Sequence, residues 1–149
     1  MKNCFLKKVL MTASLLTTLI HATSTFAYPN ATLLMDPAGN NANATDLGQV
    51  NCDASSTRLY AMIQDLSAPV PGLLLSLHIF SGIQMTTATD SFSGDVNPGP
   101  IIWIDNGPGP YYISATKTAA GSRLFTVTFQ CASSNNTLTG TSVIGIQGQ

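Results

Sequence analysis

The sequence of 149 residues carries few charges, with 9% Asp, Glu, Lys and Arg, and its mean hydropathy is slightly positive. After an expected export leader over residues 1–27, the chain keeps three basic residues against seven Asp and no Glu, for a formal charge of −4. So few basic residues exclude an electrostatic nucleic-acid interface. Low charge with abundant Gly, Pro, Ser, Thr and Asn argues against a disordered or coiled-coil protein.

The first 27 residues have the three parts of a secretory signal peptide. A basic start precedes the apolar run Val9–Ile20, and small and polar residues follow as far as Ala27. The alternative, an uncleaved membrane anchor, requires a longer apolar run than this one. We therefore expect cleavage before Tyr28, a secreted or periplasmic protein, and no membrane span in the mature chain. Residues 28–149 suffice for one hydrophobic core and form one predicted domain.

The mature chain consists of short segments in which apolar and polar residues alternate with period 2, separated by turns rich in Gly and Pro. In Arg123–Cys131, for example, Phe125, Val127 and Phe129 share one face and the threonines lie on the other. In chain order, strands are predicted over Ala31–Met35, Leu47–Cys52, Arg58–Leu66, Leu73–Phe80, Ile101–Asp105, Tyr111–Thr116, Arg123–Cys131 and Thr141–Ile146. Without sustained helical periodicity, this pattern predicts an all-β fold, a single antiparallel, jelly-roll-like β-sandwich.

Removal of the leader leaves two cysteines, Cys52 and Cys131. In an exported chain, two cysteines predict one disulfide. The alternative, a redox-active thiol pair, lacks both a CxxC spacing and an adjacent base. We expect the bond to join two strand ends across the sandwich.

Two adjoining segments carry a family resemblance. Gly107–Ala115, with its double tyrosine, followed by Gly121–Phe129 resembles the last hairpin of bacterial pre-peptidase C-terminal domains, which are secreted β-sandwich modules. The acidic pair usual in the middle strands of that family has no counterpart here. The resemblance implies a non-catalytic accessory fold of a kind sometimes used to bind matrix or carbohydrate.

Three aromatic residues lie close together in the sequence, at Trp103, Tyr111 and Tyr112. Exposed aromatic rings stack on sugars and other planar apolar surfaces, so the three residues are tentative binding residues, with a glycan or a matrix or surface protein as partner. For Trp103 itself, the favoured interpretation is a core position with Tyr111 packed beside it. Because consecutive strand residues point to opposite faces, Tyr111 and Tyr112 cannot both be core, and Tyr112 is expected outside.

Catalytic chemistry has few candidates in this sequence. His78 is the only histidine after the leader, so a Ser-His-Asp arrangement would have to use it, and no G-x-S-x-G motif is present. A pair of Asp residues could supply general acid and base, but most of the Asp lie in turn or strand-edge positions, where Asp is common for local reasons.

A calcium site is the strongest metal candidate, with Asp36, Asn40 and Asp46 as tentative ligands in an Asn-rich loop. The loop departs from the EF-hand pattern, and turn formation explains its composition equally well. No other cofactor is expected.

These observations favour an exported, non-catalytic binding or accessory protein, with carbohydrate or an extracellular surface as ligand. A small secreted hydrolase using His78 or an Asp pair is one alternative. An envelope structural or assembly subunit is another, and it would present an unpaired edge strand to a second chain.

Overall fold

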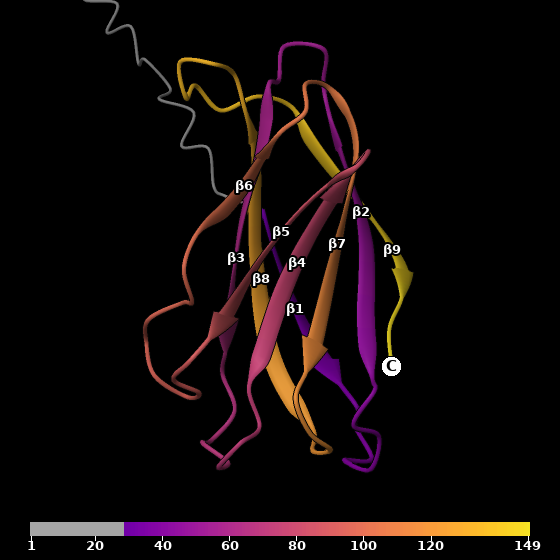
Figure 1. Ribbon diagram of the computed structural model, residues 1–149, viewed down its shortest axis with the longest axis vertical. Helices are drawn as coiled ribbons and strands as arrows, with labels where there is room; N and C mark the ends of the chain where they lie inside the picture. Colours follow the sequence, from indigo (N-terminus) through magenta and orange to yellow (C-terminus); the bar gives the residue numbers. More distant parts are fainter. Residues whose placement is uncertain (1–28) are drawn as a thin grey trace, which may run out of the picture.

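The computed structural model describes residues 29–149, none of which lies in a helix. No membrane-spanning helix occurs within that range. The predicted signal peptide, residues 1–27, lies outside the described residues. Nine strands form two sheets packed face to face (Figure 1). Their bounds are β1 Asn30–Met35, β2 Thr45–Cys52, β3 Arg58–Asp65, β4 Leu75–Ser81, β5 Gln84–Asp90, β6 Ile102–Asp105, β7 Gly109–Lys117, β8 Arg123–Ala132 and β9 Thr141–Gln147.

The two sheets have unequal widths. One is four-stranded, in the order β1-β8-β3-β6, and the other is five-stranded, in the order β5-β4-β7-β2-β9. The first eight strands pair in a nested way: β1 with β8, β2 with β7, β3 with β6 and β4 with β5, all antiparallel. The nested pairs behave as one long hairpin that is folded so that alternate pairs of strands belong to different sheets, as in a jelly roll. The predicted fold class is confirmed. β9 pairs with β2 and widens only the five-stranded sheet.

All eight predicted segments contain strands, but β5 was not predicted from the sequence. This strand forms a hairpin with β4 through a two-residue turn, Gly82-Ile83, in which Gly82 has φ +59°. A positive φ at the first turn position favours glycine and matches the twist of a tight hairpin. β5 is an edge strand rich in threonine, and its two faces differ little in polarity. It therefore lacks the alternation of apolar and polar residues by which the other strands were predicted.

The core consists of the inward-facing side chains of both sheets. β8 gives the clearest case: Phe125, Val127 and Phe129 are buried, whereas Thr126 and Thr128 are partly exposed on the outer face. The predicted register of this strand is therefore confirmed. Since β8 lies between β1 and β3, its inner face occupies the middle of the four-stranded layer.

A disulfide closes one end of the sandwich. Cys52 ends β2 in the five-stranded sheet and Cys131 lies near the end of β8 in the four-stranded sheet, with their Cα atoms 5.6 Å apart. The predicted bond and its placement across the two sheets are confirmed. It fixes β2 and β8 relative to each other at that end.

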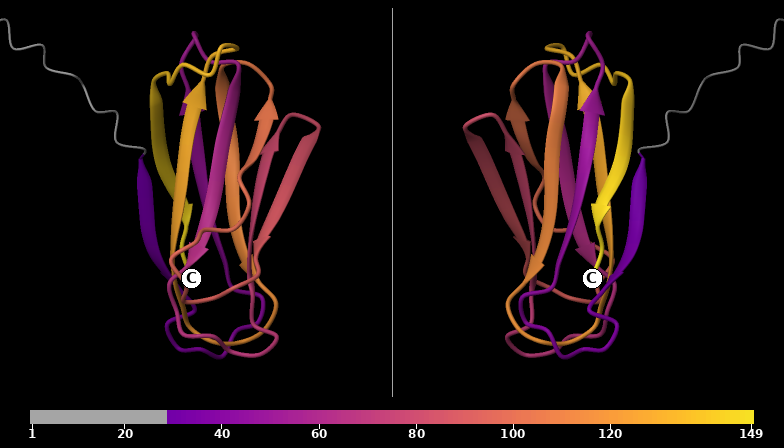
Figure 2. Two further views of the ribbon diagram at one scale, coloured as in Figure 1. Left: turned by 90° about the vertical axis from the view of Figure 1, so that its left-hand side faces the viewer. Right: turned by 90° about the vertical axis from the view of Figure 1, so that its right-hand side faces the viewer.

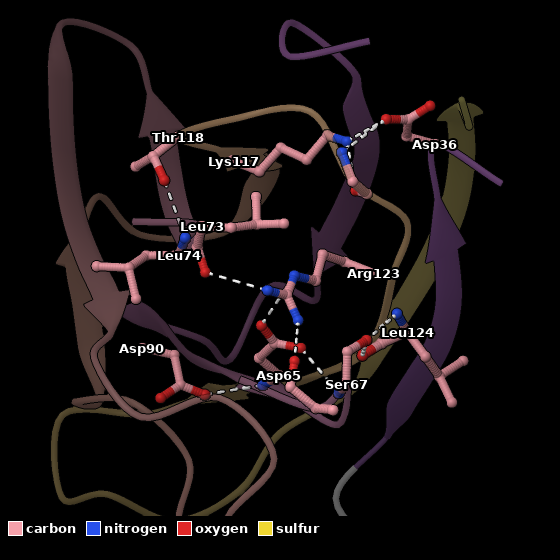
Figure 3. Close-up of polar contacts among 12 residues, drawn as sticks. Asp36, Asp65, Ser67, Leu73, Leu74, Asp90, Lys117, Thr118, Arg123 and Leu124 are labelled. Carbon is pink, nitrogen blue, oxygen red and sulfur yellow. Dashed lines mark hydrogen bonds and ion pairs between the residues drawn. The ribbon is translucent and has the colours of Figure 1, made fainter. Parts of the chain in front are cut away.

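Two buried ion pairs lie at the opposite end (Figure 3). The Lys117 ammonium at the end of β7 contacts the Asp36 carboxylate just after β1, and the Arg123 guanidinium at the start of β8 lies 3.6 Å from Asp65 at the end of β3. Arg123 also donates to the main-chain carbonyl of Leu73 at 3.3 Å. Removing one member of such a pair leaves a buried charge without its partner and typically costs about 3–5 kcal/mol.

The buried face of β8 gives a direct stability test. Phe129→Ala should lower the free energy of unfolding by about 3–5 kcal/mol, because it removes a large buried side chain and leaves a cavity. Thr128→Ala, one residue away on the outer face, should change it by less than about 0.5 kcal/mol. Urea unfolding of both variants measures the difference, and equal losses would show that the register is wrong.

Candidate binding groove

β1 and β9 are the edge strands on one side of the sandwich. The four-stranded sheet ends there at β1, and the five-stranded sheet ends there at β9. Both views in Figure 2 place β1 and β9 on the same side of the sandwich. Val143 and Ile146 of β9, and Leu33 of β1, are consequently exposed although they face the space between the layers.

A groove of about 420 Å³ occupies this space. Its walls are formed by inward-facing residues of β1, β2, β7, β8 and β9, and they are almost entirely apolar. The hollow reaches the core, since Phe125, Val127 and Phe129 of β8 form its floor. Ligand pockets commonly have volumes of about 300–1,000 Å³ and mostly apolar walls, so both its size and its chemistry suit a ligand.

Two glycines keep the middle of the groove open. Gly48 of β2 and Gly145 of β9 are register partners, and both line the groove. A Cβ built on Gly145 would meet no atom within 4 Å, and neither glycine has a positive φ. Larger residues would therefore fit the backbone at Gly145 but fill the hollow. The register shift next to Gly48 also leaves Ile146 without a partner in β2.

Among residues 29–149, Asp46 is the one ionisable side chain that lines the groove. It is only 5% exposed, and its Oδ1 accepts a hydrogen bond from the Gln149 N–H at 2.8 Å. Burial raises the pKa of Asp46, and this hydrogen bond opposes the rise. The Gln149 carbonyl in turn accepts from the Asp36 N–H at 2.5 Å. These contacts join the chain after β9 to the chain after β1 and close one end of the groove.

Within residues 29–149, the two strands that border the groove each pair with a neighbour on one side only. β1 reads NATLLM and β9 reads TSVIGIQ, with no charged residue and no proline in either. Exposed edge strands usually carry charges, prolines or bulges that prevent pairing with other chains. β9 has one irregularity, the register shift near Gly48, and β1 has none along its pairing with β8.

The three predicted aromatic residues do not form one surface. Tyr111 is fully buried, and its hydroxyl donates to the Gly107 carbonyl at 2.7 Å. Trp103 is 51% exposed on the outer face of the four-stranded sheet, where its ring centroid lies 6.2 Å from that of Tyr60. Tyr112 is 40% exposed, as predicted, but on the outer face of the five-stranded sheet. Trp103 and Tyr112 therefore belong to opposite faces of the molecule.

The residues considered for hydrolysis have other contacts. Both ring nitrogens of His78 contact threonine hydroxyls, Thr116 at 2.9 Å and Thr87 at 2.8 Å, and burial lowers its pKa. Two buried aspartates, Asp65 and Asp90, are neighbours, and Asp90 Oδ2 accepts from the Asp65 N–H at 2.8 Å. Figure 3 shows both at the end of the sandwich that carries the ion pairs.

The tentative calcium ligands also have protein partners. The Asp36 carboxylate accepts from the Lys117 ammonium and from the main-chain N–H groups of Asn40 and Asn41. The Lys117 contact holds the pKa of Asp36 well below its usual value, although burial opposes this. Asp46 faces the groove instead. In residues 29–149, no group of three His, Cys, Asp or Glu side chains is arranged to hold a metal ion.

Comparison with protein-family models, curated proteins and solved structures found no match for this chain. The groove was not predicted from the sequence, because alternation alone does not reveal that β1 and β9 become the edge strands on one open side of the sandwich. One signal was present: the C-terminal predicted strand combines apolar residues and a glycine with no charge. A protected edge strand usually carries charged residues, and glycine weakens a packed interior strand, so this segment has the features of neither.

The buried carboxyl of Asp46 predicts a specific pH dependence. Its raised pKa means that the folded protein retains this proton to higher pH than the unfolded chain, whose Asp pKa is near 3.9. Ionisation of Asp46 should therefore lower the free energy of unfolding as the pH rises from the pKa of this carboxyl in the unfolded state through its pKa in the folded state. Asp46→Asn should gain stability relative to wild type over that interval, as measured by urea unfolding from pH 3 to pH 7. Parallel curves for the two proteins would show that Asp46 titrates normally.

Proposed function

We propose that this protein is an exported, non-catalytic binding protein and that the groove between β1 and β9 is its binding site. The observation that supports this most strongly is an apolar hollow of about 420 Å³ that opens between two uncharged strand edges. An accessory role of this kind agrees with what the resemblance to secreted β-sandwich modules implies.

The energetics favour occupation of the groove. Its side walls carry the exposed apolar side chains of Leu33, Val143 and Ile146, which water contacts and a ligand would cover. Covering such surface contributes about 25 cal/mol per Å². Among the described residues, the groove walls offer one carboxyl, Asp46, and no histidine, cysteine, serine or lysine to act beside it. This inventory suits binding better than acid–base or nucleophilic chemistry.

Glycan binding at the Tyr60–Trp103 pair is the second candidate. The half-exposed Trp103 ring and its tilted tyrosine neighbour offer a stacking surface. The polar groups around the pair are already bonded to one another, however: Tyr60 donates to Asn136 at 2.8 Å, and Arg58 contacts Asp105 at 2.6 Å. Fewer polar atoms therefore remain to orient a sugar, and the groove is the better-supported site.

Gly145→Leu tests the groove. The new side chain would enter the empty space without backbone strain, so the variant should fold and lose at least about tenfold in affinity for an apolar ligand. The neutral dye Nile red is a suitable probe, titrated by fluorescence. Ser142→Leu is the matched control, because residue 142 does not line the groove and places the same leucine elsewhere on β9.

Equal dye affinity in wild type and Gly145→Leu would contradict the proposal. A glycan array then decides about the second candidate, since a sugar ligand at the aromatic pair would be lost in Trp103→Ala and retained in Gly145→Leu.

A further inference from the structure

We propose that the occupant of the groove is an extended segment of another polypeptide, which adds to β1 as a fifth strand of the four-stranded sheet. This inference rests on the proposed function and specifies the ligand. Adding a strand to an exposed sheet edge is an established mode of peptide recognition, in which main-chain hydrogen bonds supply affinity and pockets for alternate side chains supply specificity.

The outer edge of β1 has main-chain groups directed away from its neighbour. The Phe129 N–H donates to the Pro29 carbonyl at 3.2 Å, so residues 29 and 129 form a hydrogen-bonded pair. Such pairs alternate along an antiparallel ladder, and the register of β1 with β8 is unbroken. Thr32 and Leu34 therefore occupy non-hydrogen-bonded positions, and their N–H and C=O groups point away from β8, toward the free edge.

The same edge borders the hollow. Ala31 and Leu33, which alternate with these residues, line the groove. A strand hydrogen-bonded to Thr32 and Leu34 would lie beside β1 and place every second side chain over the groove. The backbone edge and the apolar hollow are thus two parts of one site, which a hydrocarbon ligand would use only in part.

A single extended segment suits this site. β9 borders the same groove from the other sheet, so the inward side chains of one strand added to β1 would already contact both sheets. Such a strand would cover the open side between β1 and β9 without a second layer of its own.

The walls indicate the side chains that such a segment carries. The floor runs along β8 from Phe125 to Phe129, a length that matches about five strand residues, of which two or three would face inward. Gly48 and Gly145 leave space for a branched apolar side chain at the centre. In the part of the chain that the structure describes, no Lys or Arg lines the groove and Asp46 lies at one end of it, so inward acidic residues are disfavoured.

A peptide library tests this inference. Eight-residue peptides would carry Ala, Val, Ile, Leu or Phe at alternate positions and Ser, Thr or Lys between them, and would be selected on the immobilised protein. Enriched peptides would then be measured by fluorescence anisotropy against Thr32→Pro and Leu34→Pro. Each proline removes an N–H that points to the free edge and leaves the ladder with β8 intact, so affinity should fall at least about tenfold.

Met85→Pro is the matched control, because residue 85 lies on the free edge of β5, at the far edge of the other sheet. It should leave peptide affinity unchanged, and thermal unfolding confirms that each variant is folded. Two proline positions on β1 keep the test decisive if one of them unfolds.

Each outcome bears on the inference. The inference is supported if enriched peptides bind the wild-type protein and lose affinity for Thr32→Pro, Leu34→Pro and Gly145→Leu. No enrichment, or peptide binding that is insensitive to both prolines, would overturn it. If Nile red binding still depends on Gly145 in that case, the groove binds apolar molecules and the proposed function stands without the added strand.

Discussion

The open side of the sandwich between β1 and β9 is the constraint on which the rest of this structure depends. Nested pairing of the first eight strands gives each sheet four strands, and β9 then becomes the edge of the five-stranded sheet. A sandwich buries its inner faces only where the layers are closed against each other. In the described part of the chain no further strand covers the space between β1 and β9, and the groove, the exposed Val143 and Ile146, and the open edge of β1 all lie on this side.

The two ends of the sandwich are fixed while this side stays open. At one end the disulfide joins β2 to β8. At the other, Lys117 holds Asp36 just after β1, and Arg123 at the start of β8 lies against Asp65. β8, which forms the floor of the groove, is thus held at both ends, so a ligand would meet a preformed surface and bind with a smaller ordering cost.

Most of the fold was predictable from the sequence because it depends on local alternation. Phe125, Val127 and Phe129 indicated the inner face of β8, and an even cysteine count indicated the disulfide. The order of strands in each sheet was not predictable, since it depends on contacts between distant segments. The Asp36–Lys117 pair illustrates this, because its members are 81 residues apart and the sequence suggested a metal ligand at Asp36 instead.

The candidate site was harder to predict for a related reason. Trp103 and Tyr112 are close in sequence, yet they occupy strands of different sheets and point in opposite directions. Conversely, Ala31, Gly48 and Gly145 are far apart in sequence and carry no reactive groups, but they meet in one hollow. A site made of small and apolar residues has no motif, and only the arrangement of strands reveals it.

The central claim is that the four-stranded sheet stops at β1 with an open edge over the groove. Residue-resolved amide hydrogen exchange in dilute, ligand-free protein tests it most directly. Ala31 and Leu33, at hydrogen-bonded positions opposite β8, should exchange slowly, whereas Thr32 and Leu34 between them should exchange much faster. Equal, strong protection of all four amides would mean that the edge of β1 is already covered, and it would contradict the claim.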